Sequence, residues 1–218
     1  MSTHETDLPV GHQFEDAEQQ LDAYSAGMWL FLVTEVLFFG GLFLAYIIYR
    51  TRYTEAFVAA HHELDWRLGG LNTLVLITSS LTMALAVRAA VIDRWKQVIG
   101  WMACTFVLAG CFMVVKYFEY SAKFEHHLFP GPNFQFHHPG IDSGEAQMFF
   151  NLYFAMTGLH GAHVLIGMIT MIILAIRLYV MRNQRVDFIP VELAGLYWHF
   201  VDLVWIFLFP LFYLVGGN

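Results

Sequence analysis

Charged residues are scarce in this sequence, and their scarcity excludes most soluble architectures. Only 13% of the 218 residues are Asp, Glu, Lys or Arg, whereas 58% are hydrophobic. Soluble domains carry about 25% charged residues. The mean hydropathy is +0.54, and long runs nearly free of charge are typical of membrane-spanning helices. The composition therefore predicts an integral membrane protein.

Basic residues and cysteines are also few. The chain has 11 Lys and Arg against 18 Asp and Glu, a formal net charge of −7. It shows neither a basic stripe nor a glycine-rich phosphate loop, so nucleic acid and nucleotides are not expected as partners. Cys104 and Cys111 fall on one face of a predicted helix about two turns apart, too far for a disulfide. We interpret them as small core residues rather than a metal pair, since no His or Met ligand set accompanies them.

Five apolar runs are long enough to cross a bilayer, which takes about 20 residues at 1.5 Å each. The sequence thus predicts an all-α polytopic membrane protein, a bundle of five transmembrane helices in residues 28–218. An acidic arm, residues 1–27, precedes them; it lacks Lys, Arg and the apolar core of a signal peptide. The predicted spans are 28–49, 71–90, 98–117, 148–178 and 196–215.

The connections between these spans indicate an orientation. Segment 121–147 is rich in Pro, Gly and aromatic residues, which favours turns, although Ser143 can begin the next helix. Basic residues near helix ends mark the cytoplasmic side and predict a cytoplasmic N-terminus and a periplasmic C-terminus. The cytoplasmic side collects Arg88, Arg94, Lys96, Arg177, Arg182 and Arg185, against Arg50, Arg52, Arg67 and Lys123 on the other side.

Ionisable groups inside a span cost several kcal/mol and usually face protein or water. In the last span His199, Asp202 and Tyr213 share a face, flanked by Trp198 and Trp205. The fourth span carries a polar stripe whose residues project within an arc of roughly 100°, namely His160, His163, Gly167, Thr170 and Arg177. Small residues beside that stripe favour close approach of a neighbouring helix, namely Gly158, Gly161 and Ala162.

The first three spans carry fewer polar groups. Asn72 begins a mild polar stripe in the second span, and Lys116 with Glu119 forms a predicted i, i+3 ion pair near the outer end of the third. Glu35 is the one acid of the first span, with phenylalanines on its face. Two hypotheses stay open for Glu35: a proton-linked or lipid-contacting carboxyl, or a neutral acid bonded to a neighbouring helix.

The intramembrane histidines raise the question of a haem or metal site. Bis-histidine sites in helical bundles use histidines on facing helices, and the first three spans contain none. Interhelical hydrogen bonding by His160, His163 and His199 is therefore the favoured interpretation. The histidine doublets of the connections could chelate zinc, but surface histidines seldom do. No cofactor or metal is expected in this chain.

Each predicted helix also carries a distinctive motif. In chain order these are TEVLFFGGLFLAY, LNTLVLITSS, YFEY, TGLHGAHVLIG and YWHFVDLVWIFLFPLFY. They occur in the same order in subunit III of the haem–copper terminal oxidases, which the sequence resembles over all five spans. Many members of that family have two further helices before the glutamate-bearing one, which form a lipid-filled cleft. This chain resembles the shorter, five-helix bacterial type.

The resemblance implies an accessory, non-catalytic subunit of cytochrome c oxidase in a bacterial plasma (inner) membrane. It would pack on catalytic subunit I, support proton uptake and bind phospholipid. The haems and copper are expected in subunits I and II, with cytochrome c as electron donor and a small subunit IV as a further partner. Subunit III of a ubiquinol oxidase and an accessory protein of nitric oxide reductase are alternatives, with a proton-coupled transporter and a membrane cytochrome b less favoured.

The resemblance also assigns roles to individual residues. Glu35 matches the buried helix glutamate of the family, and Arg177 the arginine that contacts a lipid phosphate. His199 and Asp202 are expected to fasten the last helix to its neighbours, with the polar stripe of the fourth span as a candidate partner. The expected structural polar network comprises Asn72, Lys116, Glu119, His160, His163, Trp198, His199, Asp202 and Trp205.

Overall fold

Six helices make up the described part of the chain, residues 12–181 and 186–214 of the computed structural model. Five of them are long and apolar enough to cross a membrane, which confirms the predicted all-α architecture. The sixth, α2, has 8 residues. In chain order they are α1 (Ala17–Arg52), α2 (Thr54–His61), α3 (Trp66–Val91), α4 (Trp95–Glu125), α5 (Ser143–Val180) and α6 (Phe188–Tyr213).

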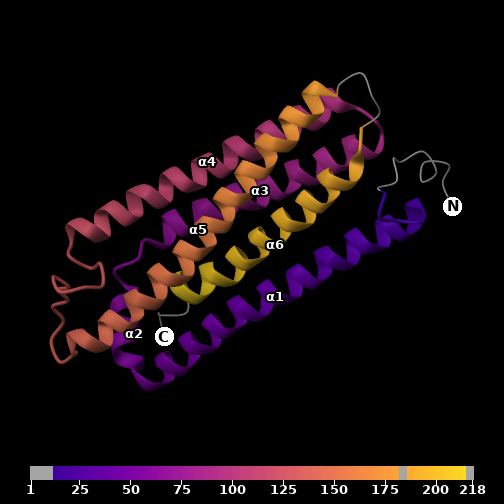
Figure 1. The fold of residues 1–218 in the computed structure, drawn as a ribbon. Helices are drawn as coiled ribbons and strands as arrows, with labels where there is room; N and C mark the ends of the chain where they lie inside the picture. The colour runs from indigo at the N-terminus through magenta and orange to yellow at the C-terminus, as the bar shows by residue number, and fades with distance from the viewer. Residues whose placement is uncertain (1–11, 182–185, 215–218) are drawn as a thin grey trace.

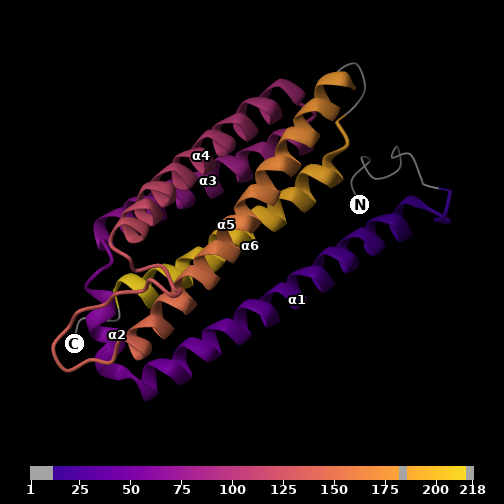
Figure 2. The same ribbon diagram turned by 60° about the vertical axis from the view of Figure 1, so that its left-hand side comes forward.

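The long helices α3 to α6 form a group, and α1 lies along one side of it (Figure 1). Helix α3 packs most extensively on α4 and next on α6, while α1 contacts α5 and α6. The N-terminal half of α1 diverges from the other helices (Figure 2). We call the end with the start of α1, the 92–94 turn and the α5–α6 link the arm end. The opposite end, with α2 and segment 126–142, is the loop end.

Helices α1, α3, α5 and α6 begin before the predicted spans, and an aspartate caps the N-terminus of each. Asp16 accepts a hydrogen bond from the Gln19 backbone N–H at 2.7 Å, so α1 begins at Ala17. The expected solvated arm is therefore helical over residues 17–27, and residues 1–11 lie outside the described part. Asp142 caps α5 in the same way, which confirms Ser143 as its first residue.

Helix α2 was not expected, because the sequence of residues 50–70 was interpreted as a loop. Its buried face consists of Ala56, Phe57 and Ala60. The Phe57 ring packs edge-on against Tyr46 of α1 and Phe149 of α5, at centroid distances of 5.5 and 5.4 Å. The short helix thus packs at the loop end of the bundle through apolar contacts. Its sequence is too short for hydrophobic periodicity to identify it as a helix.

Two details of the last helices differ from expectation. The close approach between α5 and α6 occurs at Gly167, where an added Cβ would lie 2.7 Å from Trp198 Cζ3. At Gly161, which was expected to serve this purpose, a Cβ would meet nothing within 4 Å. Helix α6 ends at Tyr213, while the predicted end at residue 215 and the basic residues Arg182 and Arg185 lie outside the described part.

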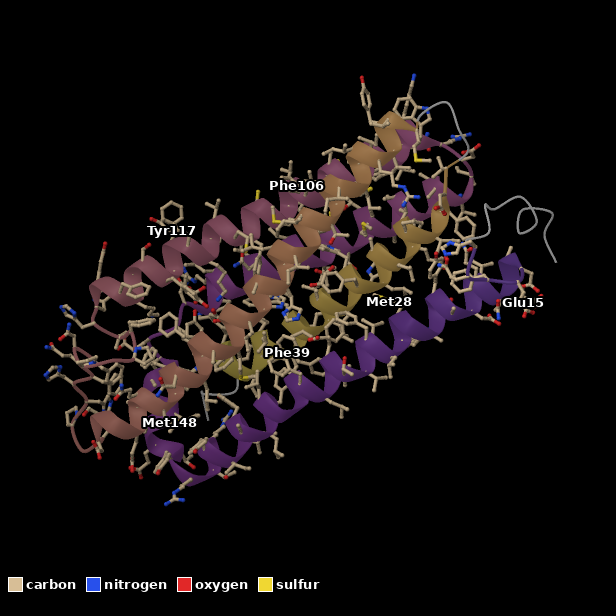
Figure 3. All side chains as sticks on the ribbon, viewed as in Figure 1. Glu15, Met28, Phe39, Phe106, Tyr117 and Met148 are labelled. Atoms are coloured by element: carbon tan, nitrogen blue, oxygen red, sulfur yellow. The ribbon has the colours of Figure 1, made fainter. Side chains whose placement is uncertain are left out.

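Side chains divide clearly between a bundle-facing and an outward-facing set. Phe39 turns from α1 toward the bundle and is 2% exposed, whereas Tyr117 points away from α4 and is 69% exposed (Figure 3). Cys104 and Cys111 are both exposed on α4, so the expectation that they are core residues is wrong. Their shared face, predicted from the spacing, is the outward one. Such an apolar exterior suits a hydrocarbon environment.

Candidate functional site

Glu35 and His163 form the polar contact between α1 and α5. Glu35 Oε2 lies 3.1 Å from His163 Nε2, and the two side chains are 20% and 15% exposed. The other ring nitrogen, Nδ1, lies 2.8 Å from the Leu159 carbonyl oxygen. Because a carbonyl can only accept, Nδ1 carries a proton. The Glu35–His163 contact then holds one further proton, either on the carboxyl or on an imidazolium.

Aromatic residues enclose this pair. Phe39 of α1 meets the His163 ring edge-on at a centroid distance of 5.3 Å. Tyr197 of α6 lies against the ring on another side, at 6.5 Å, and its hydroxyl donates to the His163 carbonyl at 3.0 Å. The apolar surroundings strengthen the electrostatic interaction of the pair, since less water screens it.

A second polar cluster joins α4, α5 and α6 nearer the loop end. Lys116 Nζ donates to Glu119 Oε2 at 3.0 Å, to the Tyr153 hydroxyl at 3.3 Å and to the Tyr213 hydroxyl at 2.7 Å. Both tyrosines donate to Glu119 Oε1, at 2.8 and 2.5 Å. The predicted Lys116–Glu119 ion pair therefore forms and is completed by two tyrosines. All three ammonium donors are used, as a buried charge requires.

His160 does not share the surroundings of His163, although both lie on the predicted stripe. Its ring is fully buried between Trp205 and Phe112, at centroid distances of 5.2 and 5.5 Å. Within the described part of the chain, neither ring nitrogen has a hydrogen-bond partner, and the same holds for the buried amide of Asn72. His160 and His163 are three residues apart, so their side chains differ in direction by about 60° around the axis of α5 and contact different neighbouring helices.

The side chains of Trp198, His199 and Trp205 of α6 make their hydrogen bonds to α3 rather than to side chains of the polar stripe of α5. Ser80 Oγ lies 2.7 Å from His199 Nδ1. The indole N–H of Trp198 donates to Ser79 Oγ at 3.1 Å. Farther along α6, the Trp205 indole N–H donates to Thr73 Oγ1, also at 3.1 Å. The hydroxyl groups of the LNTLVLITSS motif were the sequence signal for the contact between α3 and α6. The sequence alone does not show which helices are neighbours.

Asp202 lies in this interface as well. It is 4% exposed, and neither carboxyl oxygen makes a well-formed hydrogen bond with residues 12–181 or 186–214, although Ser80 lies close enough to interact with it. It lines a groove of about 390 Å³ between α3 and α6, together with Ser80 and His199. The two residues of the WHFVD motif therefore differ in their surroundings: His199 is bonded to Ser80 of α3, whereas Asp202 is a nearly buried residue of the groove lining.

Arg177 lies at the arm end of α5. Its Nη2 atom is 3.4 Å from Asp187 Oδ2, and its side chain is 50% exposed. Arg177 lines a pocket of about 270 Å³ that also includes Gln20 and Tyr24 of α1 and the first turn of α6. Within residues 12–181 and 186–214, no three His, Cys, Asp or Glu side chains gather as a metal site would require.

Comparison with known proteins relates this arrangement to a family. The family described as cytochrome c oxidase subunit III matches residues 140–217. Cytochrome c oxidase subunit 3 of Alkalihalophilus pseudofirmus is 32% identical over 191 residues, covering 87% of this chain and 85% of the relative. Cytochrome bo(3) ubiquinol oxidase subunit 3 of Pseudomonas aeruginosa is 27% identical over 211 residues, covering 95% of this chain and 92% of the relative.

A third relative is a longer protein. The heme-copper oxidase subunit I+III of Aeropyrum pernix is 30% identical over 200 residues, which are 89% of this chain but 23% of that protein. The similarity to the Alkalihalophilus protein extends over most of both sequences. The chain therefore belongs to the cytochrome c oxidase subunit III family, the accessory membrane subunits of haem–copper oxidases.

Proposed function

We propose that this chain packs on catalytic subunit I of a cytochrome c oxidase and supports proton uptake by that subunit. The haems and copper of the complex lie in subunits I and II, and a small subunit IV is a further partner. The Glu35–His163 pair carries the proposal, because it holds an exchangeable proton within the membrane at a partly exposed position. An acid and an imidazole that share one proton can accept and release it with little rearrangement.

The test compares the purified complex with wild-type chain, with Glu35→Gln and with a matched control, Thr34→Val. Thr34 neighbours Glu35 on α1, and its hydroxyl bonds only to its own helix, at Phe31 O. We expect Glu35→Gln to slow proton uptake during oxygen reduction and to change its pH dependence, while Thr34→Val leaves both unchanged. Equal proton-uptake rates in all three complexes would contradict the proposed role.

Phospholipid binding is the second part of the proposed function. The Arg177 guanidinium is half exposed and lines the pocket between α1, α5 and α6, where a lipid phosphate could pair with it. We expect Arg177→Gln to lower the phospholipid phosphorus that copurifies with the complex. Arg88→Gln is the control, because Arg88 lies in the last turn of α3, outside this pocket. Unchanged phosphorus in the Arg177 variant would exclude the site.

Ubiquinol is the alternative electron donor, since relatives named as cytochrome c oxidase and ubiquinol oxidase subunits both match most of the chain. We favour cytochrome c, because the matching family is described as cytochrome c oxidase subunit III. The purified complex should oxidise reduced cytochrome c and contain a copper-bearing subunit II. Oxygen reduction that proceeds with ubiquinol but not with cytochrome c would assign the chain to the alternative.

The proposed location is the bacterial plasma membrane, with a cytoplasmic N-terminus and a periplasmic C-terminus. The bias of Lys and Arg toward the arm end in the sequence supports it. In spheroplasts, a cysteine introduced at exposed His62 of the loop end should react with an impermeant maleimide. A cysteine introduced at exposed Arg94 of the arm end should react only after permeabilisation, and the reverse pattern would invert the topology.

A further inference from the structure

The residues that line the groove between α3 and α6 have the spacing expected of a helix-binding surface. Its α3 wall has the spacing i, i+3, i+4, i+7, and its α6 wall has the same spacing. Such positions form one face of a helix over two turns, about 11 Å. The α3 wall consists of Ile77, Ser80, Leu81 and Ala84, and the α6 wall of His199, Asp202, Leu203 and Ile206.

The groove lies at mid-depth of the long helices. Asp202 is about 16 Å from the nearer end of α6 at 1.5 Å per residue, and the hydrocarbon core is about 30 Å thick. Lipid headgroups are therefore out of reach of its carboxyl. Acyl chains carry no hydrogen-bond donor, so lipid alone would leave at least one Asp202 oxygen without a donor, which is unfavourable in an apolar environment.

The polar groups of the groove favour a partner that brings a donor. Neither Asp202 oxygen makes a well-formed hydrogen bond within the described residues, and the nearby Ser80 hydroxyl already lies 2.7 Å from Nδ1 of His199. Ser80 and Ala84 are small, so a third backbone can approach α3 closely. A transmembrane helix with a donor side chain at mid-depth meets these requirements, and a turn of the Asp202 carboxyl about its own side-chain bonds would bring an oxygen to that donor.

We propose that one transmembrane helix of subunit I docks in the α3–α6 groove and donates a hydrogen bond to Asp202. This inference rests on the proposed function and names the surface through which the two subunits meet. The subunit I+III relative supports the choice of partner, because its name places both subunits in one polypeptide. The rest of the groove contributes apolar packing, and His199, held by Ser80, borders the docked helix.

Photo-crosslinking in the intact complex tests the docking surface directly. Benzoylphenylalanine replaces Leu81 in the groove or, as a control, Val107 in an apolar hollow on α4 lined by Ala103, Cys104, Val107 and Leu108. The two sites are matched, since Leu81 is 61% and Val107 62% exposed. Irradiation should join the Leu81 probe to subunit I in several-fold higher yield than the Val107 probe.

The other outcomes overturn the proposal in distinguishable ways. Adducts of the Leu81 probe with lipid, with a second copy of this chain or with a different subunit would each assign the groove to another occupant. Subunit I that copurifies with the tagged chain but crosslinks equally well from Val107 would refute the docking surface and leave the proposed function standing. If subunit I does not copurify at all, both proposals are wrong.

Substitution of Asp202 tests the donor bond separately from folding. Asp202→Leu should lower the subunit I recovered with the tagged chain by about tenfold or more, a change of about 1.4 kcal/mol. Asp202→Asn keeps an acceptor oxygen and should retain most of the binding. The unfolding temperature of the isolated chain should change little in either variant, because among the described residues Asp202 interacts only weakly, with Ser80, and makes no well-formed hydrogen bond. A parallel loss of thermal stability would identify a structural role instead and overturn the proposal.

Discussion

His163 Nε2 lies 3.1 Å from Glu35 Oε2, while Nδ1 of the same ring is held 2.8 Å from the Leu159 carbonyl. The bond to Leu159 fixes the ring orientation and places a proton on Nδ1. The Glu35 carboxyl therefore contacts the other ring nitrogen, Nε2. This contact connects α1, the helix that diverges most from the bundle, to α5 (Figure 2). Of the two hypotheses for Glu35, the structure shows the bond to a neighbouring helix. The proton-linked role of Glu35 stays a prediction.

The Glu35–His163 contact should be measurable as a coupling energy. Glu35→Ala, His163→Ala and the double variant form a cycle whose interaction term we expect at about 0.5–2 kcal/mol, the range for polar contacts between membrane helices. Unfolding in bicelles with a mild denaturant gives the four free energies of unfolding. If the two single effects simply add, the contact does not stabilise the position of α1.

Removing one charge from the Lys116 cluster should be more costly than removing both. Lys116→Met leaves Glu119 buried with only tyrosine donors, and we expect a loss of about 3 kcal/mol in the free energy of unfolding. The double variant Lys116→Met, Glu119→Gln should recover a large part of this loss, since no unpaired charge remains. A double variant that is less stable than the single one would argue against this account.

Ser121→Ala is the control for that series. Ser121 lies on the same helix, is partly exposed, and bonds through its hydroxyl only to the Tyr117 carbonyl of its own turn. Its substitution should change the free energy of unfolding by less than about 0.5 kcal/mol. A larger effect would show that polar substitutions on α4 destabilise the bundle regardless of the cluster.

The contact of Gly167 with Trp198 predicts a site where a methyl group is not tolerated. Gly167→Ala would place a Cβ 2.7 Å from Trp198 Cζ3, so α5 and α6 must separate or the indole must shift. We expect a destabilisation of about 1–3 kcal/mol. Gly161→Ala on the same helix meets nothing within 4 Å and should be neutral or stabilising. Equal unfolding temperatures for both variants would contradict the packing.

Metal analysis tests the expectation that this chain serves without a redox centre of its own. The isolated chain should contain less than about 0.1 iron or copper atom per molecule and show no haem Soret band, because no described set of side chains offers a ligand group. The whole complex, analysed in parallel, should contain both metals. Stoichiometric iron or copper in the isolated chain would refute the assignment of the histidines to interhelical contacts.

The fold was largely predictable because length and hydropathy dominate in a membrane. A run of about 20 apolar residues has few alternatives to a spanning helix, so the five spans and their order followed from the sequence. The prediction was poorer at the ends of the helices. Aspartate caps at Asp16 and Asp142 set the starts of α1 and α5, and the short α2 depends on contacts with Tyr46 and Phe149 that no local pattern contains.

The candidate site was predictable only where its partners are close in sequence. Lys116 and Glu119 lie one turn apart, and their ion pair was expected and is formed. The completion of that cluster by Tyr153 and Tyr213 was not foreseen, because these residues come from other helices. For the same reason the stripe of α5 was considered as a candidate partner of His199, whereas His199 Nδ1 lies 2.7 Å from Ser80 Oγ of α3.

The sequence by itself determined that this is an integral membrane protein, how many long helices it has, and to which family it belongs. These properties depend on composition and on motifs that are local along the chain. Only the tertiary structure decided which polar side chains meet: Glu35 bonds to His163, His199 bonds to Ser80, and Asp202 makes no well-formed hydrogen bond within the described residues. Which side chains pair between helices depends on which helices are adjacent and on how each is rotated about its own axis. Both are set by the packing of all the helices together.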